Sequence, residues 1–64
     1  MYQTGDIRHL RADDPEHEDR AAAEREALAR SAREPEGFFG VWTGQHEGSE
    51  LLAIAHDRVL FRAA

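Results

Sequence analysis

The pattern of apolar and polar residues divides the chain near Pro35 into two parts. Up to Pro35, the segment "RAAAEREALARSARE" is rich in Ala, Leu, Glu and Arg, which are strong helix formers. After it, "FFGVWTGQHEGSELLAIAHDRVLFRA" has short apolar runs separated by turn residues, which is typical of β-strands. The sequence therefore predicts an α+β fold, with one main helix followed by a sheet.

We expect the helix at about 15–33. Asp14 is a favoured N-cap residue, and Pro15 suits the first helical position. Pro35 ends the run because it disfavours helical geometry at Glu34. At about 100° per residue, one helix face collects a small apolar set that should pack on the sheet, namely Ala21, Leu28 and Ala32, with His17 close by. The opposite side carries Asp19, Glu26, Arg30 and Arg33.

The apolar half predicts a three-stranded antiparallel sheet with strands at about 38–44, 50–56 and 59–63. The short spacers "GQHEG" and "HDR" favour antiparallel neighbours. Near the N-terminus, residues 1–3 fit a short strand or a loose end. Alternatively, Thr4 or Asp6 caps a brief helical turn that points Ile7 and Leu10 inward.

Strand alternation leaves two registers open for the first of these strands. Phe39 and Val41 share one face, and Phe38 and Trp42 share the other. Both faces of the sheet are substantially apolar, yet a single helix covers only one of them. The strand near 59–63 is also a candidate edge that could pair across a dimer axis.

The length of 64 residues fits a single domain, 1–64, near the lower limit for an independent core. The absence of Cys excludes disulfides, so we expect self-association, with a homodimer as the simplest form. No apolar run approaches the roughly 20 residues of a membrane span, and the N-terminus lacks the regions of a signal peptide. We therefore expect a soluble, cytoplasmic protein that does not bind membranes.

Thirteen acidic residues against eight basic ones give a net charge of −5, which argues against direct nucleic-acid binding. The acids concentrate in "ADDPEHEDR", residues 12–20, beyond what a helix start needs. We expect this surplus to enter a basic groove on a protein partner, as a nucleic-acid mimic. The predicted partner-binding residues are Asp13, Asp14, Glu16, Glu18 and Asp19, with Trp42 as the aromatic anchor.

Catalytic, metal and cofactor sites are not expected. The four histidines, His9, His17, His46 and His56, show neither HxH nor HExxH spacing. The chain has no Cys nucleophile, no nucleophile motif around its serines and no phosphate loop. These observations predict a protein that is not an enzyme.

The order "DDPEHEDRAAAEREALAR" and then "GFFGVWTG…ELLAIAH…VLFR" places an acidic helix before a compact antiparallel sheet. In size, acidity and layout, the chain resembles the small inhibitors encoded by phages and mobile elements, including anti-CRISPR proteins. The resemblance implies an inhibitor, in the host bacterial cytoplasm, that binds a CRISPR effector complex and blocks DNA binding or nuclease recruitment. The alternative is a small homodimeric accessory module, such as a toxin–antitoxin or phage regulatory component, that associates through its sheet face.

Overall fold

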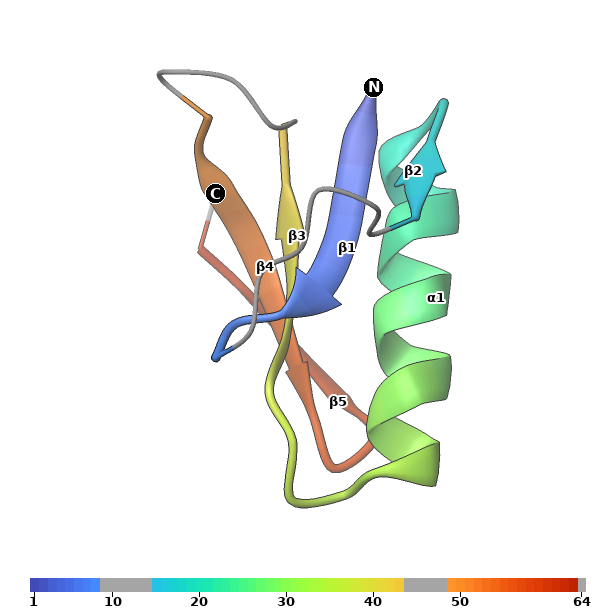
Figure 1. The fold of residues 1–64 in the computed structure, drawn as a ribbon, viewed down its shortest axis with the longest axis vertical. Helices are drawn as coiled ribbons and strands as arrows, with labels where there is room; N and C mark the ends of the chain where they lie inside the picture. The colour runs from blue at the N-terminus through green and yellow to red at the C-terminus, as the bar shows by residue number, and fades with distance from the viewer. Residues whose placement is uncertain (9–14, 44–48, 64) are drawn as a thin grey trace.

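A computed structural model describes residues 1–8, 15–43 and 49–63, in which one helix packs on an antiparallel sheet (Figure 1). The order along the chain is β1 (Tyr2–Asp6), β2 (Glu16–His17), α1 (Arg20–Arg33), β3 (Phe39–Trp42), β4 (Leu51–His56) and β5 (Val59–Arg62). In space the five strands lie in the order β2-β1-β3-β4-β5. The predicted α+β class, with one helix on an antiparallel sheet, is confirmed.

The sheet of the described residues is larger than predicted, with five strands in place of three. Strands β3, β4 and β5 correspond to the predicted ones with slightly shorter bounds. The addition is at the N-terminus, where β1 pairs with β3 through Thr4 opposite Val41. Of the two N-terminal predictions, the strand is right and extends to Asp6, so Thr4 lies within it and does not cap a helical turn. Asp6 does accept the N–H of Arg8 at 2.8 Å, but the rest of the turn predicted after it, including Leu10, lies outside the described residues. "YQTGD" has weak strand character by itself, and long-range pairing with β3 decides its conformation.

The helix begins at Arg20, five residues later than predicted. Its N-cap is Asp19, whose carboxylate accepts a hydrogen bond from the backbone N–H of Ala22 at 2.7 Å. The residues around Glu16 instead form β2, because they pair with β1. The Pro15 carbonyl also accepts the N–H of Thr4 at 3.1 Å, so Pro15 is not in the first helical turn. Asp14, the predicted cap, lies outside the described residues.

The buried face of α1 also differs from the predicted one. Ala21 is exposed, and Leu28 and Ala32 are only half-buried. The buried residues are Ala23, Glu24, Ala27 and Ser31. Two of these are polar. A prediction that places only apolar side chains toward the sheet therefore selects the wrong face of the helix. The small side chains spaced four apart allow the helix to lie close to the sheet, as in the hydrogen bond from the Thr4 hydroxyl to the Ala23 carbonyl at 3.0 Å.

The core lies between α1 and the sheet, and it is small. Phe39 and Val41 face the helix, which settles the register that the sequence left open. Their neighbours in the buried cluster are all alanines: Ala23, Ala27, Ala53 and Ala55. Phe39 is the largest fully buried side chain, and the Arg30 guanidinium lies 4.6 Å from the centre of its ring. The predicted outward position of Arg30 is therefore only partly right.

Candidate functional site

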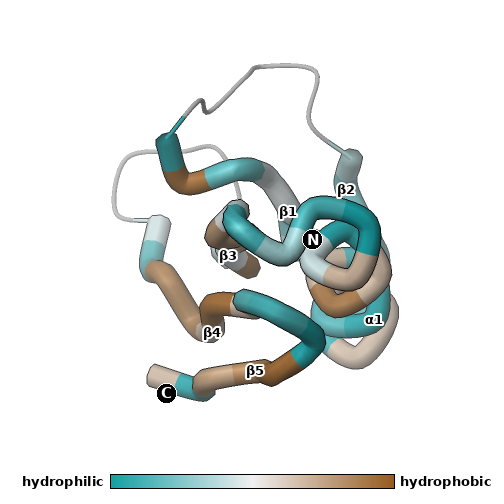
Figure 2. Tube along the Cα trace, turned by 90° about the horizontal axis from the view of Figure 1, so that it is seen from below, coloured by the Kyte–Doolittle hydropathy of each residue, from teal (hydrophilic) through white to brown (hydrophobic). Residues whose placement is uncertain are grey.

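The most distinctive surface is the sheet face turned away from α1, which we call the open face. Figure 2 shows α1 against one side of strands β1, β3, β4 and β5 only. Within the described part of the chain, no helix or strand covers the other side. Because side chains alternate along each strand, that side carries the residues that the buried cluster omits. Its apolar members are Phe38, Trp42, Leu52, Ile54, Val59 and Phe61.

Trp42 has a defined position on the open face because Gly40 makes room for it. A Cβ atom at Gly40 would lie 2.5 Å from Cη2 of the indole, so the six-membered ring lies directly over this glycine. The cross-strand partners of Gly40 are Gly5 on β1 and Ile54 on β4. Neither glycine has a side chain on this face, and the half-buried indole of Trp42 covers Gly40.

A second aromatic group lies at the other end of the open face. The rings of Phe38 and His56 stack with their centroids 4.0 Å apart and their planes within 4°. Nδ1 of His56 is 2.9 Å from the Gly37 carbonyl oxygen. Since a carbonyl only accepts, Nδ1 donates this hydrogen bond. This bond fixes the orientation of the ring on which Phe38 rests.

The apolar side chains nearest β5 are the most exposed. Phe61 is 57% exposed and Val59 50%, whereas Leu52 is only 7% exposed. Phe38, at 40%, belongs with the exposed group. Together with Trp42, these side chains give the open face the composition of a protein contact surface, in which exposed aromatic groups supply most of the affinity.

The predicted acidic site is only partly assembled by the structure. Gln3 pairs with both Trp42 and Glu16, so these three residues form one row across the open face. Two strand spacings, about 10 Å, separate Trp42 from Glu16 along that row. Glu18 is exposed just before the helix, whereas the Asp19 carboxylate is engaged as the helix cap. Asp13 and Asp14 lie outside the described residues.

A buried carboxylate on the helix side has a structural role. Glu24 accepts hydrogen bonds from Arg62 of β5 at 3.0 and 3.2 Å and from Arg20 at 3.1 Å. These bonds, chiefly those from Arg62, hold the pKa of Glu24 below its usual value despite the opposing effect of burial. The cluster ties α1 to β5 and does not contribute to the open face.

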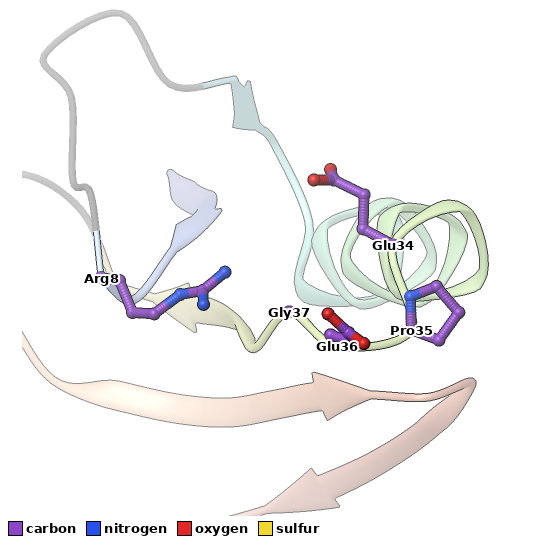
Figure 3. A pocket seen from close by; sticks show the side chains of 5 residues that line it. All are labelled: Arg8, Glu34, Pro35, Glu36 and Gly37. Atoms are coloured by element: carbon purple, nitrogen blue, oxygen red, sulfur yellow. The ribbon is translucent and has the colours of Figure 1, made fainter.

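A groove lies at the C-terminal end of α1 (Figure 3). Its volume is about 470 Å³, and it is lined by Arg8, Glu34, Pro35, Glu36 and Gly37. Arg8 lies across the groove from the two glutamates and forms an ion pair with Asp6 at 3.3 Å, which raises the pKa of Arg8. Its titratable lining residues are one guanidinium and two carboxylates, and the lining includes no Ser, Thr, Cys, His or Lys.

Among the described residues, no three His, Cys, Asp or Glu side chains come together as metal ligands. The helix found there is neither long nor apolar enough to cross a membrane. No protein-family model, curated protein or solved structure matches the chain. The open face is therefore the candidate site. The sequence predicted Trp42 as an aromatic anchor but left its face open, and it did not include Phe61 and Ile54, although the excess of apolar strand residues was a signal for them.

Proposed function

We propose that the protein is a non-enzymatic binding module that inhibits a protein partner by docking its open face onto it. The observation that carries this proposal is the exposure of large apolar side chains on that face, with Phe61 at 57%, Val59 at 50% and Phe38 at 40%. A small domain has few apolar residues for its core, and here several of the largest lie outside it. Contiguous apolar side chains in water are typical of interaction sites.

The charge distribution supports a partner whose contact site combines an apolar pocket with a basic rim. Glu16 lies in the same cross-strand row as Trp42, and Glu18 is two residues further along the chain. In this arrangement the aromatic group enters the pocket, and the carboxylates at the edge of the sheet meet Arg or Lys side chains around it. The net charge of −5 speeds the encounter with a basic surface.

The resemblance to anti-CRISPR proteins suggests one partner of this chemistry, a CRISPR effector complex. Such complexes hold nucleic acid in positively charged channels. A small acidic protein that occupies part of such a channel, or the adjoining nuclease-docking surface, prevents DNA binding or nuclease recruitment. We place the contact on the open face and its acidic edge, rather than on the outer face of a helix as the sequence alone predicts.

The CRISPR hypothesis is tested by phage plating on bacteria with active CRISPR immunity, with and without expression of this protein. We expect wild-type protein to restore plaque formation, and Trp42→Ala to lose most of that effect because it removes the anchor. Arg25→Glu, at an exposed position of α1, is the control and should act as wild type. Immunity that persists across representative CRISPR types would reject the CRISPR partner.

The proposed binding surface is tested with two double variants of equal net charge. Each variant is first used as bait to capture a partner, and its association rate with the purified partner is then measured. Glu16→Arg/Glu18→Arg and Glu34→Arg/Glu36→Arg each raise the net charge by four units, two per substitution, from −5 to −1. We expect the first pair to slow association about tenfold at low salt and the second to have little effect. High salt should remove the difference. Equal rates for the two variants, or a captured partner indifferent to Trp42→Ala, would reject the proposed surface.

A further inference from the structure

Strand β5 is an edge of the sheet, and no other strand of the described residues lies beside its outer backbone groups. The N–H of Ala63, one residue past the strand, donates to the Leu52 carbonyl at 2.9 Å. In an antiparallel ladder, alternate residues direct both backbone groups toward the neighbouring strand. The odd-numbered residues of β5 therefore face β4, and the N–H and C=O groups of Leu60 and Arg62 point away from it.

The β4–β5 turn supports this assignment. Asp57 and Arg58 both have positive φ, 46° and 66°, as in the two-residue type I′ turn that closes a tight hairpin. Such a turn is flanked by a hydrogen-bonded pair, here His56 and Val59. The hairpin is also in register from end to end, so β5 presents a regular edge.

The two edges of the sheet differ in their protection against pairing. At one edge, β2 is only two residues long and directly follows Pro15, both of which limit strand addition. At the other edge, β5 has four residues, none of them Pro or Lys. Its one charged side chain, Arg62, is directed to Glu24 on the helix side and leaves the edge accessible.

We propose that β5 pairs antiparallel with β5 of a second copy of this chain, around a two-fold axis at Phe61. In this register, Leu60 of each copy lies opposite Arg62 of the other. In each of these two pairs, the N–H of either residue donates to the carbonyl of its partner, which gives four hydrogen bonds across the axis. Phe61 then faces its own counterpart as a non-hydrogen-bonded pair, with Cα atoms about 4.5 Å apart, where aromatic side chains contact each other. Other symmetric registers would pair only part of β5 and would form fewer of these hydrogen bonds.

This pairing has two consequences for the dimer. The two-fold axis is perpendicular to the sheet, so both helices lie on one side, and the two open faces join on the other. Glu16 of β2 lies four strand spacings, roughly 19 Å, from β5 in each copy, so it remains far from the axis. The pairing does not depend on the proposed function, because it uses the edge of the sheet.

The register is tested by single cysteines in a chain that has none. Phe61→Cys places two thiols within disulfide distance across the axis. Val59→Cys is the matched control, because Val59 is similarly exposed but lies four residues, about 14 Å, from its counterpart along the paired strands. We expect Phe61→Cys to form linked dimers under mild oxidation at least about tenfold faster than Val59→Cys, with both variants folded by circular dichroism. Equal rates would overturn the proposal.

Unmodified protein supplies an independent measurement. Light scattering over a concentration series should show monomer converting to dimer, and amide exchange of Leu60 and Arg62 should slow as the dimer forms while that of Glu16 and His17 does not. A monomer mass at all concentrations would overturn the proposal. A dimer that alters the fluorescence of Trp42 but not the exchange of Leu60 and Arg62 would also overturn it, since that result indicates pairing of open faces.

Discussion

The two faces of the sheet differ in a way opposite to simple expectation. The face covered by α1 contains Phe39 and Val41 among alanines, and the open face contains Trp42, Leu52, Ile54 and Phe61. The small residues are thus in the core, and several larger ones are in contact with water. The comparison shows that an Ala-rich helix stabilises the fold through close approach and polar contacts, which leaves large side chains available for other contacts.

The sharpest test of this comparison is to truncate one Phe on each face. Phe39→Ala should cost about 3–5 kcal/mol, because Phe39 is fully buried and the cavity has few large neighbours to fill it. That is comparable with the whole stability of a small domain, so the variant should be largely unfolded. Phe61→Ala should change the stability by less than about 0.5 kcal/mol per mole of monomer at concentrations where the protein is monomeric. Urea denaturation followed by circular dichroism measures both, and similar losses would mean that the open face is part of the core.

The hydrogen-bonded cluster of Glu24, Arg20 and Arg62 is tested by Glu24→Gln, which keeps the shape of the side chain and removes its charge. Its partner Arg62 has a side chain that is 66% exposed, so solvent screening limits the expected loss to about 1–2 kcal/mol at neutral pH. Thermal melts would detect it. The control Glu26→Gln, on the same helix, should have a smaller effect.

The loss of stability in Glu24→Gln should also depend on pH. Because folding lowers the pKa of Glu24, its contribution is complete above the unfolded-state pKa of about 4.3 and is lost as pH falls through the lower folded-state pKa. The stability difference between wild type and Glu24→Gln should therefore shrink as pH decreases below about 4. A difference that stays constant from pH 7 to pH 3 would contradict the role of the ionised Glu24 carboxylate in stability.

The start of the helix is tested by Asp19→Ala, with Glu18→Ala as the control. Asp19 caps the helix through the N–H of Ala22, so its loss should cost about 1 kcal/mol. Glu18 is exposed and should have an effect within about 0.5 kcal/mol. Denaturation midpoints decide between them, and equal effects would indicate that the cap is elsewhere.

The packing of Trp42 on the open face is tested by Gly40→Ala. The added methyl group would overlap the six-membered ring of Trp42, which is the far end of a half-buried side chain, so the ring must move. We expect a cost of about 1 kcal/mol or less, because the side chain moves rather than the sheet. Trp42 is the single tryptophan of the chain, so a red shift of its fluorescence reports the movement. An unchanged spectrum would contradict the packing of Trp42 on Gly40.

The sequence predicted the parts of the fold that local pattern determines. The Ala-rich segment forms a helix that ends at Arg33, as expected, and the three apolar runs form β3, β4 and β5. The excess of apolar residues over what one helix can cover was also visible. These features depend on residue propensity and period, which act over a few neighbouring positions.

The features that the sequence predicted wrongly depend on contacts between residues that are distant along the chain. Glu16 has helical neighbours in sequence, but it pairs with β1 in space. Glu24 is turned inward because Arg62, 38 residues away, supplies its hydrogen bonds. The candidate site shows the same limit: the sequence predicted Trp42 and Glu16 as separate partner-binding residues, and only the strand register places them in one row.

The pairing of β1 with β3 also has a kinetic consequence. Gln3 lies opposite Trp42, 39 positions along the chain, so the ends of a long loop must meet before this pairing contributes any energy. Domains with such distant contacts fold more slowly than helical bundles of similar size. We therefore expect helix α1 and the β4–β5 hairpin to form first and the arrival of β1 to limit the folding rate. In that order, the open face acquires its acidic edge last.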